Sequence, residues 1–410
     1  MVKKNTKCRI CSRRKFTKFL ILGPQPPANA FLRKKDLKKR EKFYPLDVYF
    51  CHTCNLAQLL DIVSKEELFR NYIYFTSGMP KISDHFKNYA LHVIKKFLKP
   101  NDFVVEIASN DGVLLEFFKK RRFKTLGIEP ALNIVKVAGK LGIETIPKFF
   151  SERLAKQIAK KYGKAKIIMA NNVVAHIDDH QDLCRGLNAL LSEDGVFILE
   201  APYLIDMFEN LTFDTVYHEH LSFLAIRPLS YLFNLHGLEI FDVQVVPVQG
   251  MSIRVFAGKK GRHNIKPIVK KLIKKELSCK LDKLGTYKKL ALRVSESKSK
   301  LMALLKKFKK QGRTIAGYGA PAKGNTILNY YKIGTDILDF AIEHLPSKQG
   351  LYTPGTHIPV VPPDYAKQHE PDYYLMLAWN YKKAILEKEK KFRKKGGKFI
   401  IPVGDEIEVL

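Results

Sequence analysis

The apolar residues of this chain recur in two alternating patterns between residues 83 and 204. Short continuous apolar runs are typical of buried strands, and apolar positions at intervals of three and four residues are typical of amphipathic helices. The runs predict strands at 103–108, 125–129, 166–174 and 195–204, and the stretches around them predict helices at 83–98, 114–121, 131–142 and 178–191. This alternation predicts a doubly wound parallel sheet.

A helical stretch at 262–310 separates this unit from a second one of the same kind. The second unit has predicted strands at 314–320, 337–343, 373–379 and 398–403, with a helix at 321–331. Two further strand-like runs, 44–51 and 56–63, lie near the start of the chain. We therefore predict an α/β fold with two doubly wound, Rossmann-like domains, at 76–258 and 259–410, and a small N-terminal module at 1–75.

Composition and charge restrict the class of protein. The chain has 410 residues, 46% of them hydrophobic, which is enough for several packed cores. With no run of eighteen apolar residues and no secretory pattern at its start, we expect a cytoplasmic protein that does not enter a membrane. The formal charge of +32 would suit nucleic acid, an anionic membrane surface or an acidic small substrate. Because the basic residues are scattered over predicted helices, we attribute most of the charge to solvated helix faces.

Four of the six cysteines form two C-x-x-C pairs, Cys8 with Cys11 and Cys51 with Cys54. Two thiolates three positions apart can bind one ion from a tight turn, and two such pairs complete a tetrahedral site. Disulfides, a redox dithiol and a catalytic zinc ion are the alternatives. A reducing compartment disfavours disulfides, and four thiolates leave no open position for catalysis. We predict a structural zinc ion (Zn²⁺) in the N-terminal module.

The turn after the predicted strand 103–108 contains acidic and small residues between Glu106 and Gly112. Ligands of open α/β sheets bind beyond the carboxyl ends of the strands, and Glu129, which ends the next strand, can accept hydrogen bonds from both hydroxyls of a ribose. The motif G-x-G-x-x-G is absent, which disfavours NAD. The turn instead resembles the glycine-rich loop of class I S-adenosylmethionine methyltransferases, with Ala108 and Asn110 at two glycine positions. An ordinary strand-to-helix turn is the alternative.

Two segments contain candidate catalytic histidines. The sequence Tyr217-His218-Glu219-His220 groups four side chains that donate, accept or titrate, and a histidine oriented by a carboxylate is a good general base near neutral pH. An extended backbone would direct His218 and His220 to one face, whereas a turn would break this alternation. A metal site and a hydrogen-bonded loop cluster are the alternatives. His176 follows an apolar strand at its carboxyl end, where it is either a ligand contact or a structural residue.

The second unit contains a Gly-rich turn that enters a helix, within residues 317–326. Backbone N–H groups at such a helix start, together with the ammonium group of Lys323, suit an anionic ligand. The spacing G-x-x-x-x-G-K-[ST] is absent, which argues against ATP hydrolysis. Asn380, just after the predicted strand 373–379, is a second polar candidate. A plain turn and a strand cap are the alternatives for these two features.

Taken in order, these motifs resemble the sugar C-methyltransferases that act on nucleotide-linked 4-keto-deoxysugars. The resemblance covers essentially the whole chain. It rests on the paired C-x-x-C module followed by NYIYFTS (71–77), EIASNDG (106–112), LGIEP (126–130), ANNVVAHI (170–177), FDTVYHEH (213–220), GYGAPAKGN (317–325), YTPGTHIP (352–359) and LAWN (377–380). The resemblance implies that the second domain binds S-adenosylmethionine and that the third binds the nucleotide-linked sugar, with dTDP favoured and GDP as the other option.

The resemblance also implies residue roles. A base removes a proton next to the sugar ketone, at the third sugar carbon, and the resulting enolate takes the methyl group. The implied base is His220, held by Glu219, and the groups around the ketone are Tyr217, His176 and Tyr74. The implied cofactor contacts are Glu106, Asn110, Asp111, Glu129 and Asn171. The implied substrate contacts are Lys323, Asn325, His357 and Asn380.

Two competing hypotheses keep the fold but change the function. A nucleic-acid methyltransferase would use the basic surface, but the sequence has no known RNA-binding module and no interleaved aromatic and basic runs. A non-catalytic sugar-nucleotide binding protein would have lost methyl transfer, which the presence of Tyr217, Glu219, His220 and Glu129 argues against. We therefore expect a monomeric enzyme with a small-molecule substrate and no nucleic-acid partner. The segment EHLPSKQG (343–350) departs from the family pattern and leaves the nucleotide and the sugar open.

Overall fold

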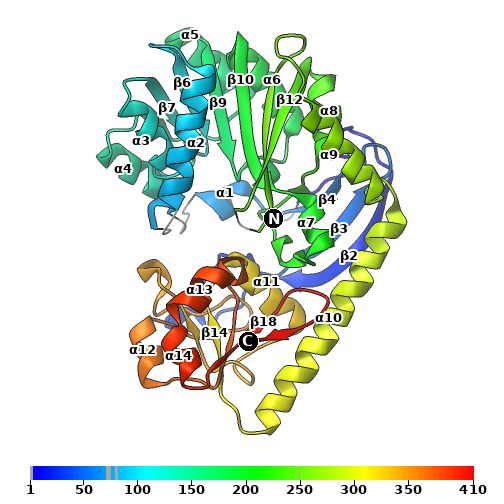
Figure 1. Ribbon diagram of the computed structural model, residues 1–410, viewed down its shortest axis with the longest axis vertical. Coiled ribbons are helices and arrows are strands. Elements are labelled where there is room, and N and C mark those ends of the chain that lie inside the picture. The colour runs from blue at the N-terminus through cyan, green and yellow to red at the C-terminus, as the bar shows by residue number, and fades with distance from the viewer. Residues whose placement is uncertain (1–2, 71–74, 79–81, 249) are drawn as a thin grey trace.

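The computed structural model describes residues 3–70, 75–78, 82–248 and 250–410 (Figure 1). These residues form an N-terminal module (3–70), a first α/β unit (82–259) and a second α/β unit (314–410), with two helices between the α/β units. In Figure 1 the first unit occupies the upper half of the molecule and the second unit the lower half, and a long helix runs along one side.

The first α/β unit contains a seven-stranded sheet. Its strands lie in the order β12 (Leu238–Val246), β13 (Ser252–Lys259), β10 (Leu191–Pro202), β9 (Ala165–Asn171), β6 (Phe103–Ile107), β7 (Lys124–Ile128) and β8 (Thr145–Ile146). The strands from β10 to β8 are parallel, as predicted. The hairpin of β12 and β13 was not among the predicted strands, and β13 runs antiparallel to both of its neighbours.

Helices cover both faces of this sheet, which explains why its strands read as continuous apolar runs. Successive side chains of a strand point to opposite faces, so Val104 belongs to one core and Val105 to the other. The core around Val104 includes residues of α2 (Ile82–Phe97) and α3 (Val113–Lys119). The core around Val105 includes residues of α5 (Glu152–Tyr162), α6 (His180–Leu190) and α8 (Ile226–Leu235). Two shorter helices complete the unit, α4 (Leu132–Lys140) and α7 (Leu204–Glu209).

The second α/β unit contains a six-stranded sheet. Its strands lie in the order β16 (Val360–Val361), β15 (Ala341–Ile342), β14 (Ile315–Tyr318), β17 (Tyr373–Leu375), β18 (Lys398–Ile401) and β19 (Glu408–Val409), parallel except for β19. Its helices are α11 (Ala322–Tyr331), α12 (Pro363–Gln368), α13 (Lys382–Lys388) and α14 (Lys390–Lys394). Of the predicted strand 337–343, only β15 is a strand. Ile337 and Leu338 are buried, but their backbone is irregular, so their apolar side chains gave a strand-like pattern.

Two helices join the units, α9 (Pro267–Ser278) and α10 (Leu284–Lys310), within the stretch predicted to be helical. The 27 residues of α10 bury a stripe that includes Tyr287, Leu290, Val294, Leu301 and Leu305 and expose lysines elsewhere. Over the ranges that the structure describes, no helix combines the length and the apolar character needed to cross a bilayer.

The N-terminal module is built around a four-stranded sheet in the order β11, β4, β3, β2. Its own strands are β2 (Phe16–Gln25), which was not predicted, β3 (Tyr44–Cys51) and β4 (Ala57–Leu59), and the edge strand β11 (Ser222–Phe223) comes from the first α/β unit. A separate pair of short strands, β1 (Lys3–Lys4) and β5 (Asp61–Ile62), precedes helix α1 (Lys65–Phe69). The module is therefore completed in space by a segment more than 150 residues away in the chain.

The module also contacts the helix α10 and the second α/β unit. The ring of Tyr287 lies 4.9 Å from the ring of Phe19 and 4.7 Å from that of Phe50, centroid to centroid. Leu32 and Tyr352 exchange two backbone hydrogen bonds, each 2.9 Å long. The N-terminal module thus packs against both α/β units.

Candidate active site

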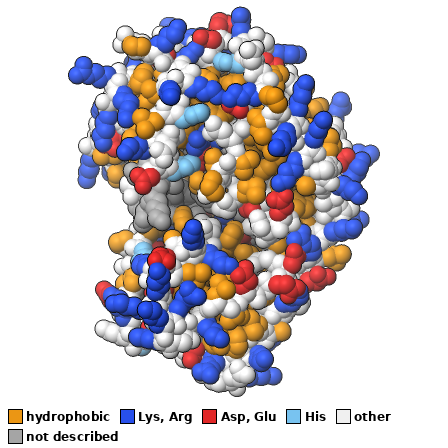
Figure 2. All heavy atoms as spheres, viewed as in Figure 1, with side chains coloured by type: hydrophobic (Ala, Val, Ile, Leu, Met, Phe, Trp, Pro, Cys, Tyr) orange, Lys and Arg blue, Asp and Glu red, His pale blue; other side chains and the backbone are white. Residues whose placement is uncertain are grey.

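One large cavity, about 1320 Å³ in volume, lies between the two α/β units and is also lined by the N-terminal module. Figure 2 shows the molecule hollowed at the level where the upper and lower halves meet. The lining comes from the carboxyl ends of β6, β7 and β9, from the turn after residue 216, and from the ends of β14 and β15. The carboxyl ends of both parallel sheets therefore face one space.

The turn between β6 and α3 keeps the shape of a glycine-rich loop although it contains one glycine. Ala108, Asn110 and Gly112 all have left-handed backbone, with φ of 53°, 49° and 83°. A side chain at Gly112 would also meet Ile143, whose Cγ1 lies 2.9 Å from the position of such a Cβ. The backbone therefore keeps the left-handed conformation that glycine adopts easily, and this conformation carries a steric cost at Ala108.

Glu129 lines the cavity and holds this turn in place. Its Oε2 accepts a hydrogen bond from the backbone N–H of Asn110 (3.0 Å), and its Oε1 accepts one from that of Ala131 (2.9 Å). Burial raises the pKa of the carboxyl, and the two N–H donors partly oppose that shift. The predicted ribose contact is thus in the cavity, with further lone pairs on both oxygens.

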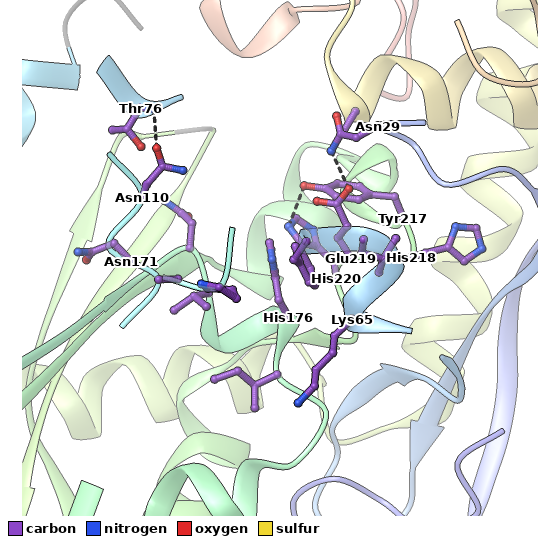
Figure 3. Close-up of a pocket in the computed structure, with 18 of the residues that line it drawn as sticks. Asn29, Lys65, Thr76, Asn110, Asn171, His176, Tyr217, His218, Glu219 and His220 are labelled. Carbon is purple, nitrogen blue, oxygen red and sulfur yellow. Dashed lines mark hydrogen bonds between the residues drawn. The ribbon is translucent and has the colours of Figure 1, made fainter. Parts of the chain in front are cut away.

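Glu106 and Asn171, two cofactor contacts implied by the family resemblance, come together at the ends of β6 and β9 and line the cavity. Figure 3 shows Asn171 in this lining. The Asn171 amide donates to Oε1 of Glu106 over 3.2 Å. Burial, together with the charges of Asp111 and Glu129, raises the pKa of Glu106 to about 8. Among the described residues, Oε2 of Glu106 is buried without a hydrogen-bond partner, which fits a site that receives a positively charged ligand.

Asp111 does not line the cavity, unlike the other predicted cofactor contacts. It is fully buried, and its Oδ2 accepts a hydrogen bond from the backbone N–H of Ser77 (2.9 Å). Next to it, Oδ1 of Asn110 accepts from the N–H of Thr76 (3.0 Å, Figure 3). The two side chains therefore tie the segment 76–78 to the cofactor loop. Tyr74, predicted near the ketone, lies outside the described residues.

His220 is buried in the turn that follows the 3₁₀ helix Phe213–Thr215, and both of its ring nitrogens are engaged. Nδ1 lies 2.7 Å from the carbonyl oxygen of Thr215, so Nδ1 carries the proton and donates it. Nε2, 2.9 Å from the Tyr217 hydroxyl, then accepts. Burial, with the nearby His176 and Lys323, holds the pKa of His220 well below its usual value. The ring is a neutral base whose basic nitrogen is Nε2.

The expectation that Glu219 holds His220 is wrong. The chain bends at residues 217–219, so the His220 ring folds back onto Thr215 rather than lying beside the carboxylate. Glu219 instead accepts a 2.6 Å hydrogen bond at Oε1 from the side-chain amide of Asn29, in the N-terminal module (Figure 3). Asn29 was not among the predicted site residues, because no local pattern pairs residues 190 positions apart.

The two other histidines of this region separate. The ring of His176 lies 4.9 Å from that of His220, centroid to centroid, and burial lowers its pKa to about 4. His218 points away from this pair, and its Nε2 is 3.2 Å from the carbonyl oxygen of Tyr44 (Figure 3). The segment is thus a turn and not an alternating strand. The structure brings Tyr217, His220 and His176 together, as the family resemblance implied.

On the opposite side of the cavity, Lys323 lies in the first turn of α11 and is buried. Its Nζ is 5.2 Å from the centroid of the Trp379 ring, whose Nε1–H donates to Oδ2 of Asp214 (2.6 Å). Burial lowers the pKa of Lys323, and the charges of Asp214 and Asp206 oppose that shift. Asn380 also lines the cavity, as predicted.

Two predicted substrate contacts lie elsewhere. The Asn325 amide donates to the carbonyl oxygen of Ala28 (2.7 Å), and Nε2 of His357 is 2.6 Å from Oε1 of Glu41. Neither residue lines the cavity, and both hold the N-terminal module on the second unit; their contact with the substrate stays a prediction. Lys348, which was not predicted, does line it, buried with its Nζ donating to the carbonyl oxygen of Ala320 (2.8 Å). It belongs to the segment 343–350 that departs from the family pattern.

The four cysteines of the two C-x-x-C pairs converge as predicted, with ligand atoms within 4.8 Å of one another. Sγ of Cys8 is 3.5 Å from that of Cys54, and Sγ of Cys11 is 3.5 Å from that of Cys51. A tetrahedral ion with Zn–S distances of about 2.3 Å places its sulfurs about 3.8 Å apart, so the group fits zinc. None of the four lines the cavity, which fits a structural ion.

Comparisons with known proteins agree with this architecture. Three family models match the chain in order, namely a zinc binding domain at 8–69, a methyltransferase domain at 83–243 and a C-methyltransferase C-terminal domain at 247–404. The chain is 35% identical to the C-methyltransferase NovU of Streptomyces niveus over 398 residues, which is 97% of this chain and 95% of that protein.

Solved structures overlap with less than half of the chain. An S-adenosylmethionine-dependent methyltransferase from Clostridium acetobutylicum is 14% identical, with a TM-score of 0.35, over 44% of this chain and 94% of its own. Magnesium protoporphyrin IX methyltransferase from Synechocystis is 11% identical, with a TM-score of 0.33, over 43% of this chain and 79% of its own.

The similarity to NovU spans nearly the full length of both proteins, and the matched domains coincide with the cysteine cluster and the two α/β units. Four converging thiolates supply the zinc site, and the turn after β6 has left-handed backbone at three positions. The chain therefore belongs to the C-methyltransferase family, as an S-adenosylmethionine-dependent enzyme with a structural zinc ion.

Proposed function

We propose that this enzyme methylates a carbon of a nucleotide-linked 4-keto-deoxysugar, at the third sugar carbon, with dTDP as the favoured nucleotide and GDP as the alternative. The observation that carries the proposal is a neutral, buried imidazole with a basic Nε2 beside a phenol, in a cavity that is lined by both carboxyl and ammonium groups. A ketone acidifies the adjacent C–H bond, and a neutral imidazole positioned beside that carbon has a free lone pair to take the proton.

His220 is the proposed general base. In the structure the Tyr217 hydroxyl donates to Nε2, so the hydroxyl must turn away before Nε2 can accept a proton. The oxygen of the ketone offers Tyr217 a new acceptor, and the same rotation frees Nε2 to take the proton from the carbon. The C–H electrons become those of the enolate, and Tyr217 donates to its oxygen as charge develops there. The Thr215 carbonyl then stabilises the protonated ring through Nδ1–H.

S-adenosylmethionine would supply a methyl group on a sulfonium, with the neutral thioether of S-adenosylhomocysteine as the leaving group. We assign Glu106, Asn110, Glu129 and Asn171 to its binding, with Asp111 holding their loop. His176 is assigned to the ketone side, together with Tyr74. Glu219 no longer has the role of orienting His220, and we assign it to accept a hydrogen bond from the sugar. Each of these groups except Asp111 and Tyr74, which is not described, lines the same cavity.

The diphosphate of the substrate is assigned to the end of the cavity that contains Lys323, with Asn380 beside it. A buried ammonium at a helix start is suited to phosphate oxygens. The charge of +32 does not decide the substrate, because Lys and Arg side chains are spread over the face shown in Figure 2 rather than gathered at the hollow. We propose that the enzyme is a monomer and that it acts on a small molecule and not on nucleic acid. We also propose domain boundaries after residues 75 and 258.

Two measurements test this function. Isothermal titration with S-adenosylhomocysteine, dTDP and GDP should show binding of the cofactor product and preference for one nucleotide. When a dTDP-linked 4-keto-deoxysugar is incubated with the enzyme in deuterium oxide without cofactor, the hydrogen at the third sugar carbon should exchange for deuterium. When S-adenosylmethionine is added, the sugar should be converted to the methylated product. Cofactor binding with no nucleotide preference and steeply salt-dependent binding of RNA would instead favour the nucleic-acid substrate.

A further inference from the structure

The side chain of Asn29 has no role in the proposed methyl transfer so far. It belongs to the N-terminal module yet lines the cavity, and its Nδ2–H donates to Oε1 of Glu219 over 2.6 Å. Figure 3 shows it reaching the Tyr217–His220 turn from above, from a different part of the chain. Glu219 is 2% exposed, so its charge depends on neighbouring donors rather than on water.

The backbone around Asn29 is held from the second α/β unit. The carbonyl oxygen of the preceding residue, Ala28, accepts from the buried amide of Asn325 (2.7 Å), and Leu32 pairs with Tyr352 through two backbone hydrogen bonds. The Asn325 amide lies in α11, two residues after Lys323. The position of the Asn29 amide is therefore set jointly by the module and by the substrate-side unit.

A second group defines the surroundings of the Glu219 carboxylate. Lys348, buried in the second unit, interacts electrostatically with both Glu343 and Glu219. Its Nζ is fixed by the carbonyl oxygen of Ala320 and lies 4.9 Å from the ring centroid of Phe31, also in the N-terminal module. Glu219 thus receives a direct hydrogen bond from the N-terminal module and interacts electrostatically with an ammonium group of the second unit.

We propose that Asn29 is a positioning residue that orients the Glu219 carboxylate toward the sugar, so that the zinc-binding module takes part in the reaction and does more than stabilise the fold. The inference rests on the proposed function. In this proposal the loop 26–32 of the N-terminal module forms part of the active site, and contacts with the second α/β unit hold it in position. A donor of fixed geometry, and not the volume of the side chain, is what this role requires.

The experiment compares Asn29→Ala, the isosteric Asn29→Asp and a control, Asn5→Ala, in steady-state methyl transfer to the dTDP-linked ketosugar. Asn5 is a matched control because its amide also joins the module to a carboxylate of the first unit, Asp178, at 3.3 Å. That carboxylate keeps its 3.1 Å hydrogen bond from Arg9 when Asn5 is replaced. Zinc content and affinity for S-adenosylhomocysteine are measured for every variant, to show that each is folded.

We expect Asn29→Ala to lower kcat at least tenfold, with the KM for the ketosugar and the cofactor affinity changed less than threefold. Asn5→Ala should keep kcat within twofold. In Asn29→Asp, two carboxylates face each other at hydrogen-bond distance and cannot both be ionised, so one stays protonated to a higher pH. When the introduced carboxyl group is protonated it donates as the amide did, so the activity of this variant relative to the unmodified enzyme should rise as the pH falls.

A contact that only stabilises the fold would not change the pH profile in this way. Unchanged kcat in both Asn29 variants, in protein that methylates the ketosugar, would overturn the inference and leave the proposed function intact. Unmodified enzyme that transfers no methyl group to any nucleotide-linked ketosugar would overturn the proposed function and this inference with it.

Discussion

The two α/β units meet at one cavity and line it with different sets of buried titratable side chains. The first unit presents the carboxyl groups of Glu106 and Glu129, and the second presents the ammonium groups of Lys323 and Lys348. Both units direct the carboxyl ends of parallel strands at the cavity, so the fold alone does not distinguish them. Under the proposed function, a few buried side chains, and not the strand topology, select the cofactor at one end of the cavity and the nucleotide-linked sugar at the other.

The largest expected effect is on kcat and concerns His220, which lies between the two ends of the cavity. Replacing His220 with Ala should lower kcat about 10³-fold, because it removes the base, whereas affinities for S-adenosylhomocysteine and for dTDP should stay within threefold. Since the pKa of His220 is held well below its usual value, the ring is neutral at pH 7, and kcat should fall only in acid, as the ring takes up a proton. The checks are steady-state kinetics from pH 4 to 9 and calorimetry. Equal loss of both affinities would show a structural role and contradict the assignment.

Zinc removal should affect both ends of the cavity at once. Cys51→Ser breaks the four-thiolate site of the module that contacts both units, and a structural zinc ion contributes directly to folding. We expect loss of zinc and a fall in the melting temperature on the order of 10 °C. Calorimetric scanning with metal analysis measures this. Cys184→Ser, at a buried cysteine outside the cluster, should keep its zinc, and a zinc-free variant with unchanged melting would refute the structural role.

A pair of substitutions tests the contrast between the two ends directly. Glu129→Gln should weaken the affinity for S-adenosylhomocysteine about tenfold and leave the affinity for dTDP unchanged. The carboxylate now accepts hydrogen bonds from two backbone N–H groups, and the amide NH₂ of Gln would face one of these donors without accepting from it. Lys323→Ala should weaken dTDP about tenfold and leave the cofactor product unaffected. Titration calorimetry of both variants with both ligands gives the four affinities. If either substitution weakens both ligands equally, the two ends are not independent sites.

Cofactor binding should release a proton at the acidic end. The pKa of Glu106 is raised to about 8, so its carboxyl is mostly protonated at pH 7 in the free enzyme. A positively charged ligand favours the carboxylate, so affinity for S-adenosylmethionine should increase as the pH rises toward 8 and level off above it. Calorimetry at pH 7 in buffers of different ionisation enthalpy counts the protons. Glu106→Gln should abolish the release, and a proton count of zero in the unmodified enzyme would contradict the raised pKa.

The smallest effect compares the turns at the two ends. Ala108, after β6, and Gly319, after β14, both have left-handed backbone, with φ of 53° and 84°. Ala108→Gly should stabilise the protein by about 0.5 kcal/mol, because relief of a steric cost of about 1–2 kcal/mol is partly offset by the extra chain entropy of glycine. Gly319→Ala should destabilise it by more than about 1 kcal/mol, since its Cβ would also lie 2.7 Å from that of Ala378. Urea unfolding measures both, and equal effects would show that the backbone conformation does not matter.

Local sequence determined much of this architecture. Periodic apolar residues and turn residues predict most strands and helices of both α/β units, because buried strands and amphipathic helices leave direct patterns in the chain. The cysteine spacing predicts the metal cluster for the same reason, since each C-x-x-C pair is a local structure. The turn after β6, Tyr217, His220, His176 and Lys323 were singled out from the sequence and line one cavity, because each follows a predicted strand or belongs to a family motif.

Only the tertiary structure decided which of these residues meet. Asn29 reaches Glu219 across 190 residues, β11 completes the sheet of the N-terminal module, and Asn325 and His357 hold that module on the second unit. The His220 ring is fixed by the Thr215 carbonyl because the chain turns there, which no alternation of polar and apolar residues specifies. Such contacts depend on how three regions of the chain pack together, so no periodic pattern of residues in the sequence predicts them.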